Sequence, residues 1–148
     1  MSQLVYYLLL KPLSRLPFSV LYFCSDILAF ILYRIVGFRR KVVLENIKNA
    51  FPDYSNQQVK ATAKQFYQHF CDLILESVKL FSILEEEAVK RCKVVNPELL
   101  DYYHEQGRNI SLITGHYANW ELAAVALNSQ IKTQPIAIYK PLKNKTFD

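Results

Sequence analysis

Residues 109–140 read NISLITGHYANWELAAVALNSQIKTQPIAIYK, and this stretch predicts a strand, a helix and a second strand. Ile110 to Thr114 and Pro135 to Tyr139 are short apolar runs typical of buried strands, and the helix between them extends from Trp120 to about Asn128. Two strands joined in this way form a βαβ unit, whose strands are parallel. We therefore expect an α/β fold in which these residues begin a mixed, largely parallel sheet flanked by helices.

Two titratable side chains lie beside the expected end of the first strand. His116 follows the carboxyl end of that strand, where open parallel sheets bind ligands, and Glu121 lies in the first helical turn, where the helix dipole favours a carboxylate. The carboxylate can hold the imidazole in one tautomer, so His116 is suited to act as a general base toward a hydroxyl. A His and a Glu at this spacing also occur by chance, but their expected position at the end of a strand favours a catalytic role. Lys140 follows the second strand, while Trp120 is either a lipid-facing residue or a core residue.

The composition fits one ordinary domain. The chain has 148 residues, 51% apolar side chains and only 3 Gly, so it can bury a core. The net charge of +5 suits a nucleic acid or an anionic membrane surface. Cys24, Cys71 and Cys92 lack metal or redox spacing, which predicts reduced thiols in a cytosolic compartment. His104-Glu105 lacks the second His of a zinc-binding HExxH motif, so we expect no metal site.

The first 41 residues differ from the rest of the chain. The run Leu16 to Tyr33 has one charge, Asp26, and about the minimum length for crossing a hydrocarbon core. A central Asp costs about 2.5–3.5 kcal/mol on an insertion scale. A spanning helix, a helix lying in the membrane interface and a buried core helix therefore all stay open. We expect residues 1–41 to form a membrane-associated apolar segment with a basic collar, and residues 42–148 to form a separate α/β domain.

The basic collar consists of Arg34, Arg39, Arg40 and Lys41. Basic residues gather on the cytoplasmic side of membrane segments and attract anionic head groups. The collar therefore predicts contact with anionic lipids of the inner leaflet and places most of the chain in the cytoplasm, with a solvated basic turn as the alternative. Because the collar adjoins an apolar segment and lacks interleaved aromatic residues, we expect no nucleic-acid binding.

The clearest helix is predicted at residues 55–81, because Ser55 and Gln58 form a capping box at its start. Its expected buried stripe contains Val59, Ala63, Phe66, Phe70, Leu73, Ser77 and Leu80, of which Ser77 is the one polar member.

Two shorter helices follow. Ser82 and Glu85 repeat the capping box for a helix that ends near residue 91. After a strand candidate at Lys93 to Asn96, Asn96 is the expected cap of a helix that has Pro97 in its first position and ends before Gly107.

The stretch GHYANWE, from Gly115 to Glu121, resembles the signature of the bacterial lipid A biosynthesis (lauroyl/myristoyl) acyltransferases, within the lysophospholipid and glycerophosphate acyltransferase group. That group carries a His, four residues, and then an Asp or a Glu. The resemblance also covers the apolar amino-terminal segment, Arg39-Arg40-Lys41, the stretch ENIKNAFP that ends at Pro52, the helix of residues 55–81, and Tyr139-Lys140-Pro141 with Asn144 and Asp148. Members of the family are much longer, so the resemblance implies that residues 42–148 are the amino-terminal part of a truncated acyltransferase domain.

The resemblance implies a reaction at the bacterial inner membrane, with the catalytic side facing the cytoplasm. His116, oriented by Glu121, would deprotonate a hydroxyl of a lipid A precursor, and that oxygen would attack the acyl thioester of acyl carrier protein or acyl-CoA. The resemblance places Asn119, Trp120 and Lys140 in substrate binding, and it implies no cofactor. Two alternatives stay open: the same chemistry on a lysophospholipid, a glycerol phosphate or an aminoacyl lipid, or a non-catalytic membrane-surface adaptor.

Overall fold

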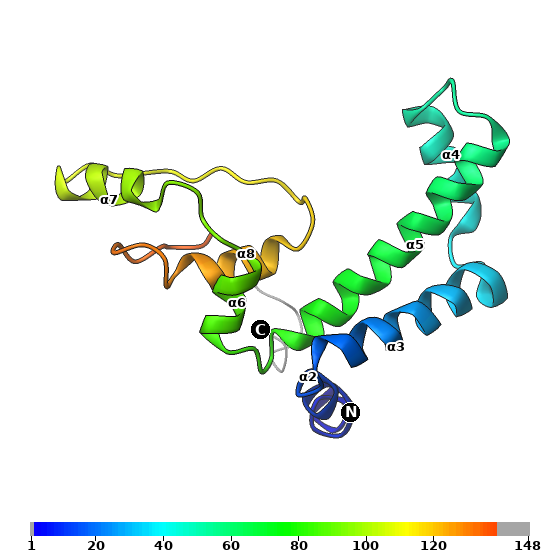
Figure 1. Cartoon of the computed structure of the whole chain (residues 1–148), viewed down its shortest axis with the longest axis horizontal. Coiled ribbons are helices and arrows are strands. Elements are labelled where there is room, and N and C mark those ends of the chain that lie inside the picture. Colours follow the sequence, from blue (N-terminus) through cyan, green and yellow to red (C-terminus); the bar gives the residue numbers. More distant parts are fainter. Residues whose placement is uncertain (1, 139–148) are drawn as a thin grey trace. The chain divides into compact units, whose positions relative to one another are not determined.

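The computed structural model describes residues 2–138, and its regular structure there is helical throughout (Figure 1). In chain order the elements are α1 (Ser2–Val5), η1 (Tyr6–Leu10), α2 (Lys11–Ser14), α3 (Phe18–Phe30), η2 (Ile31–Val36), α4 (Arg40–Ala50), α5 (Asn56–Lys79), α6 (Glu85–Arg91), α7 (Pro97–Glu105) and α8 (Trp120–Leu127), of which η1 and η2 are π-helical. The contacts divide the chain into two compact units. The first is Leu16–Glu76, and the second combines residues 2–15 with residues 77–138.

The expected α/β fold with a mixed, largely parallel sheet is wrong, because no strand occurs within residues 2–138. Ile110 to Thr114, residues 135–138 and Lys93 to Asn96 have no ladder partner, and Ile113 and Ile136 are 95% and 92% exposed. A parallel strand exists only through hydrogen bonds to a neighbouring strand and through helices that cover its faces. An apolar run shows which side chains a strand would bury, but it provides neither the neighbouring strand nor the covering helices. Tyr139, the end of the second expected strand, lies outside the described residues.

The unit Leu16–Glu76 is built on a pair of antiparallel helices, which lie side by side in Figure 1. One helix is α3 with its continuation η2, and the other is α5. Positions four residues apart are buried on both, as expected when the i±4 ridges of two helices pack together. These positions are Leu21, Ser25, Ala29 and Tyr33 on the first helix and Val59, Ala63, Tyr67, Cys71 and Leu75 on the second.

The buried stripe of α5 differs in part from the predicted one. Val59 and Ala63 are buried as expected, but Tyr67 then replaces Phe66, which is 43% exposed. The shift brings Tyr67 into contact with the turn after η2 and with Tyr33 of η2. The Tyr67 hydroxyl donates a hydrogen bond to the Phe38 carbonyl oxygen, and its ring packs against Tyr33 at a centroid distance of 5.3 Å. Apolar periodicity does not register such contacts.

Three side-chain hydrogen bonds join α3 to α5, and we refer to them as the polar seam. The Tyr22 hydroxyl donates to the Glu76 carboxylate at 2.6 Å, and the Ser25 hydroxyl donates to Asp72 at 2.5 Å. Further along, the Gln68 amide donates to Asp26 at 2.5 Å. The charge of Asp26, which stood out within an apolar run, therefore belongs to a contact between two helices.

Local signals account for the ends of these helices. Gly37 has a φ of +64° and ends η2, and the Phe38 amide donates to the Leu32 carbonyl oxygen at 3.0 Å across that turn. The predicted capping box of α5 is confirmed. The Ser55 amide donates to Gln58 Oε1 at 2.9 Å, and the Gln58 amide donates to Ser55 Oγ at 3.3 Å.

The second unit joins the amino-terminal helices to the segment after α5. The Ser82 hydroxyl donates to the Ser14 carbonyl oxygen at 2.7 Å, and the rings of Tyr6 and Phe81 meet edge to face at 5.4 Å. The second predicted capping box is wrong. The residue before α6 is Leu84, which makes no capping bond, and Ser82 makes the contact with Ser14 instead.

α6 and α8 form the core of the second unit, with Ala88, Leu122 and Ala126 buried together. The Gln130 side chain joins these helices by donating to the carbonyl oxygens of Cys92 and Ala126 at 3.0 and 2.6 Å. In α7 the predicted Pro97 start is confirmed, and Gly107 follows the end with a φ of +69°. Asn96 precedes that helix with a φ of +58°, but its side chain makes no capping bond.

Candidate functional site

The GHYANWE stretch forms the loop that leads into α8. Asn119 accepts a hydrogen bond from the Leu122 amide at 2.9 Å, which confirms it as the predicted cap of this helix. Leu122 and Ala126 anchor α8 by facing its core. Ala118 turns the preceding backbone with a φ of +49°. His116 and Glu121 thus lie on either side of a fixed helix start.

Glu121 is half-buried in the first turn of α8, as predicted. Its Oε2 accepts a hydrogen bond of 2.7 Å from the hydroxyl of Ser77, near the end of α5. A hydrogen bond to a carboxylate is stronger than one between neutral groups and restricts the orientation of the acid. Sequence reasoning treated Ser77 as a polar break in an apolar stripe. That break was the available signal, but it could not identify a partner 44 residues away.

His116 is exposed, and its ring lies edge-on against Trp120 with centroids 5.1 Å apart. The structure thus places Glu121 against Ser77 and His116 against Trp120. Within residues 2–138 no hydrogen bond or ion pair joins the imidazole to the Glu121 carboxylate. A direct contact between the two side chains therefore stays a prediction.

The other expected site residues are distributed over the chain. Trp120 is 44% exposed, so its ring is available to a ligand beside His116. Lys140 lies outside the described residues. The four collar residues are exposed around the turn from η2 to α4. Lys41 has an i,i+4 contact with Glu45 at 3.9 Å, whereas Arg34 and Arg40 lie over the Tyr33 ring.

A family comparison identifies the chain. The model of the bacterial lipid A biosynthesis acyltransferases matches residues 2–148, which is almost the whole sequence. The chain belongs to this family. No curated protein and no solved structure matches it.

Membership confirms the resemblance carried by the GHYANWE stretch, and it assigns this lipid A acyltransferase chain to transferases of lipid A biosynthesis. Among residues 2–138 the structure adds one helical stretch, Phe18–Val36, that is long and apolar enough to cross a membrane. In the part of the chain that the structure describes, no three His, Cys, Asp or Glu side chains are arranged to hold a metal ion.

Proposed function

We propose that this lipid A acyltransferase moves a fatty acyl group from acyl carrier protein, or from acyl-CoA, to a hydroxyl of a lipid A precursor. One observation supports this most strongly. His116 lies in the loop just before α8 and Glu121 in its first turn, and a hydrogen bond from Ser77 orients the Glu121 carboxylate. An exposed imidazole, in the same loop and helix start as an oriented carboxylate, suits a general base that must meet a large lipid alcohol.

The proposed step is a direct transfer. His116 takes the proton of the acceptor hydroxyl, and the oxygen attacks the thioester carbonyl. The new carbon–oxygen bond forms as the carbon–sulfur bond breaks, and the imidazolium then gives its proton to the leaving thiolate, which departs as the thiol. Glu121 stabilises that imidazolium, which requires the exposed His116 ring to turn from Trp120 toward the carboxylate.

Three neighbouring residues are proposed to bind the substrates. The exposed Trp120 ring offers an apolar surface for an acyl chain beside His116. Asn119 shapes the loop by capping α8, and Lys140 supplies a cation for the phosphorylated acceptor. No cofactor is needed, because a thioester is already activated toward an alcohol.

The proposed location is the cytoplasmic side of the bacterial inner membrane. The exposed collar of Arg34, Arg39, Arg40 and Lys41 suits the anionic lipids of the inner leaflet. Exposed apolar side chains of α3 precede the collar in the sequence and provide a surface for lipid contact.

Acyl transfer by the intact gene product tests this proposal. We expect His116→Ala to lower transfer of a labelled acyl group from acyl carrier protein to a lipid A precursor by about 10²–10⁴-fold, the usual contribution of a general base. His104→Ala, which alters another exposed histidine, is the matched control. Unchanged transfer by His116→Ala would overturn the assignment. Preferred transfer to a lysophospholipid would keep the chemistry and change the acceptor.

A further inference from the structure

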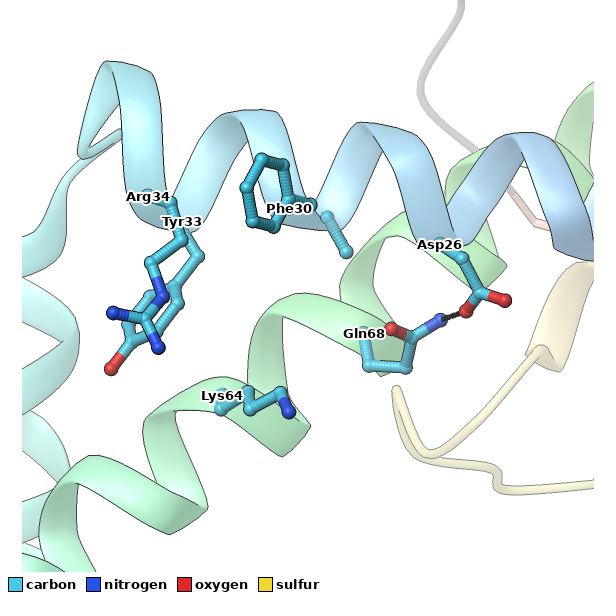
Figure 2. Close-up of a pocket in the computed structure, with 7 residues that line it drawn as sticks. Asp26, Phe30, Tyr33, Arg34, Lys64 and Gln68 are labelled. Atoms are coloured by element: carbon cyan, nitrogen blue, oxygen red, sulfur yellow. Dashed lines mark hydrogen bonds between the residues drawn. The ribbon is translucent and has the colours of Figure 1, made fainter.

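The α3–α5 pair contains a hollow of about 220 Å³ whose lining mixes two cations with an apolar wall (Figure 2). It lies entirely within the unit Leu16–Glu76. Its lining residues are Asp26, Ala29, Phe30, Tyr33, Arg34, Lys64 and Gln68. None of them belongs to the GHYANWE site.

The charges around the hollow favour an anion. Its one carboxylate, Asp26, already accepts a hydrogen bond from Gln68 (Figure 2). Arg34 and Lys64 are exposed, and neither takes part in an ion pair within residues 2–138. The guanidinium of Arg40 lies 5.1 Å from the Tyr33 ring centroid, and that of Arg34 lies 5.5 Å from the same centroid. Two guanidinium groups on one ring concentrate positive charge, and within residues 2–138 no carboxylate forms an ion pair with either group.

The surface that leads to the hollow favours a lipid over a free anion. Val20, Phe23, Ile27 and Phe30 are exposed at steps of three and four residues along α3, and we refer to them as the apolar stripe. Arg34 follows Phe30 by one further step, at the end of the stripe. A phosphate ion would gain nothing from the stripe, whereas a phospholipid places acyl chains beside its phosphate.

The polar seam bears on how α3 meets the membrane. Ser25, one of its members on α3, is buried, whereas the stripe is exposed, and the seam ties α3 to Asp72 and Glu76 of α5. A spanning α3 would carry the carboxylates of Asp72 and Glu76 with it into the hydrocarbon core, at a high cost in desolvation. A helix lying along the bilayer surface keeps the seam in the polar region and the stripe in the lipid.

We propose that the hollow binds the headgroup phosphate of a membrane phospholipid through Arg34 and Lys64, with its acyl chains along the apolar stripe and α3 lying in the plane of the interface. This inference rests on the proposed membrane attachment but not on the chemistry of His116. Arg40 adds to the local positive charge, and Phe30 separates the phosphate position from the chains.

Vesicle flotation of the full chain tests the site. We expect the wild type to float with phosphatidylcholine vesicles that contain one fifth phosphatidylglycerol, and the double variant Arg34→Gln/Lys64→Gln to bind about 30-fold more weakly, from about 1 kcal/mol for each cation. Lys60→Gln is the control for Lys64→Gln, one turn away on α5 and outside the hollow. An equal loss for the Lys60→Gln and Lys64→Gln single variants would mean diffuse attraction and would overturn the site. So would a double variant that loses binding of inorganic phosphate but still floats normally.

The orientation has its own measurement. Phe23→Trp and Phe30→Trp, each in a Trp120→Phe background, are compared for quenching by lipids brominated at different depths. Seven residues of helix cover about 10 Å. The two positions therefore differ in depth by about 10 Å if α3 spans the bilayer, whereas both are shallow if α3 lies in the plane of the interface. Deep quenching at Phe23 would overturn the orientation. Flotation and quenching need no acyl transfer, so a failure of the site and a failure of the proposed reaction can be told apart.

Discussion

Ser77→Ala tests whether the contact between α5 and α8 orients the acid of the proposed dyad. The substitution removes a hydroxyl that donates to the Glu121 carboxylate at 2.7 Å. A hydrogen bond to a charged group contributes about 1.5–3 kcal/mol, and leaving the carboxylate half-buried without it adds a desolvation cost. Because Glu121 is half-buried and water can replace part of the contact, we expect a loss of about 1–2 kcal/mol in stability.

The same variant should affect catalysis through the orientation of Glu121. If the oriented carboxylate acts mainly in the transition state, a loss of about 1–2 kcal/mol lowers kcat by about 5–30-fold and changes KM little. Ser77→Thr keeps the hydroxyl and should restore most of the rate. Steady-state transfer kinetics and urea unfolding, measured on the same preparations, give both quantities.

Ser129→Ala is the matched control for Ser77→Ala. The Ser129 hydroxyl makes only a 3.4 Å bond to the Ala126 carbonyl oxygen, in the same unit, so its loss should change stability by less than about 0.5 kcal/mol. If Ser77→Ala resembles this control in both kcat and stability, the carboxylate does not depend on Ser77 and the reasoning fails. A rise in KM without a change in kcat would also contradict a role in positioning the dyad.

Two further predictions concern the unit Leu16–Glu76. Burial raises the pKa of the Cys71 thiol, so the folded state keeps its proton after the unfolded thiol ionises near about pH 8.5, and stability should fall as the pH rises above that value. Urea unfolding from pH 8 to pH 10 should therefore show a shallower decline for Cys71→Ala, and an unchanged slope would contradict the assignment. Gly37→Ala should lower the free energy of unfolding by about 1–2 kcal/mol, because Gly37 has a φ of +64°, which is unfavourable for a residue with a Cβ atom. No neighbour lies within 4 Å of the new methyl group, so the loss comes from the backbone and not from a steric clash. Gly115→Ala, at a position without positive φ, should cost less in the same thermal unfolding experiment.

The parts of the fold that the sequence predicts well are those fixed by contacts between near neighbours. Ser55 and Gln58 are three residues apart, as are Asn119 and Leu122, and both caps are present as expected. Strand pairing has no such local signal. Ile113 fits the composition of a buried strand, yet it is almost fully exposed because nothing in residues 2–138 pairs with its backbone.

In the candidate site, too, the sequence predicts the local features but not the long-range contact. The motif itself singled out His116 and Glu121, because their spacing lies within one loop and one helical turn. The partner of the carboxylate could not be found, since Ser77 belongs to a different helix 44 residues earlier. A polar residue inside an apolar stripe is thus a better sign of a tertiary contact than of a weakened helix.

Whether α3 spans the membrane or lies in its interface depends on the difference between its two sides, which an average hydropathy does not show. Phe18–Val36 meets the length and composition of a span, but that measure treats every side of a helix alike. The side of α3 with Ser25 is buried against α5, and the side with Phe23 is exposed. A helix with two unlike sides gains most when lipid contacts only one of them. The depth of Phe23 relative to Phe30 therefore decides between a spanning helix and an interfacial helix. The average hydropathy of the helix cannot decide between them.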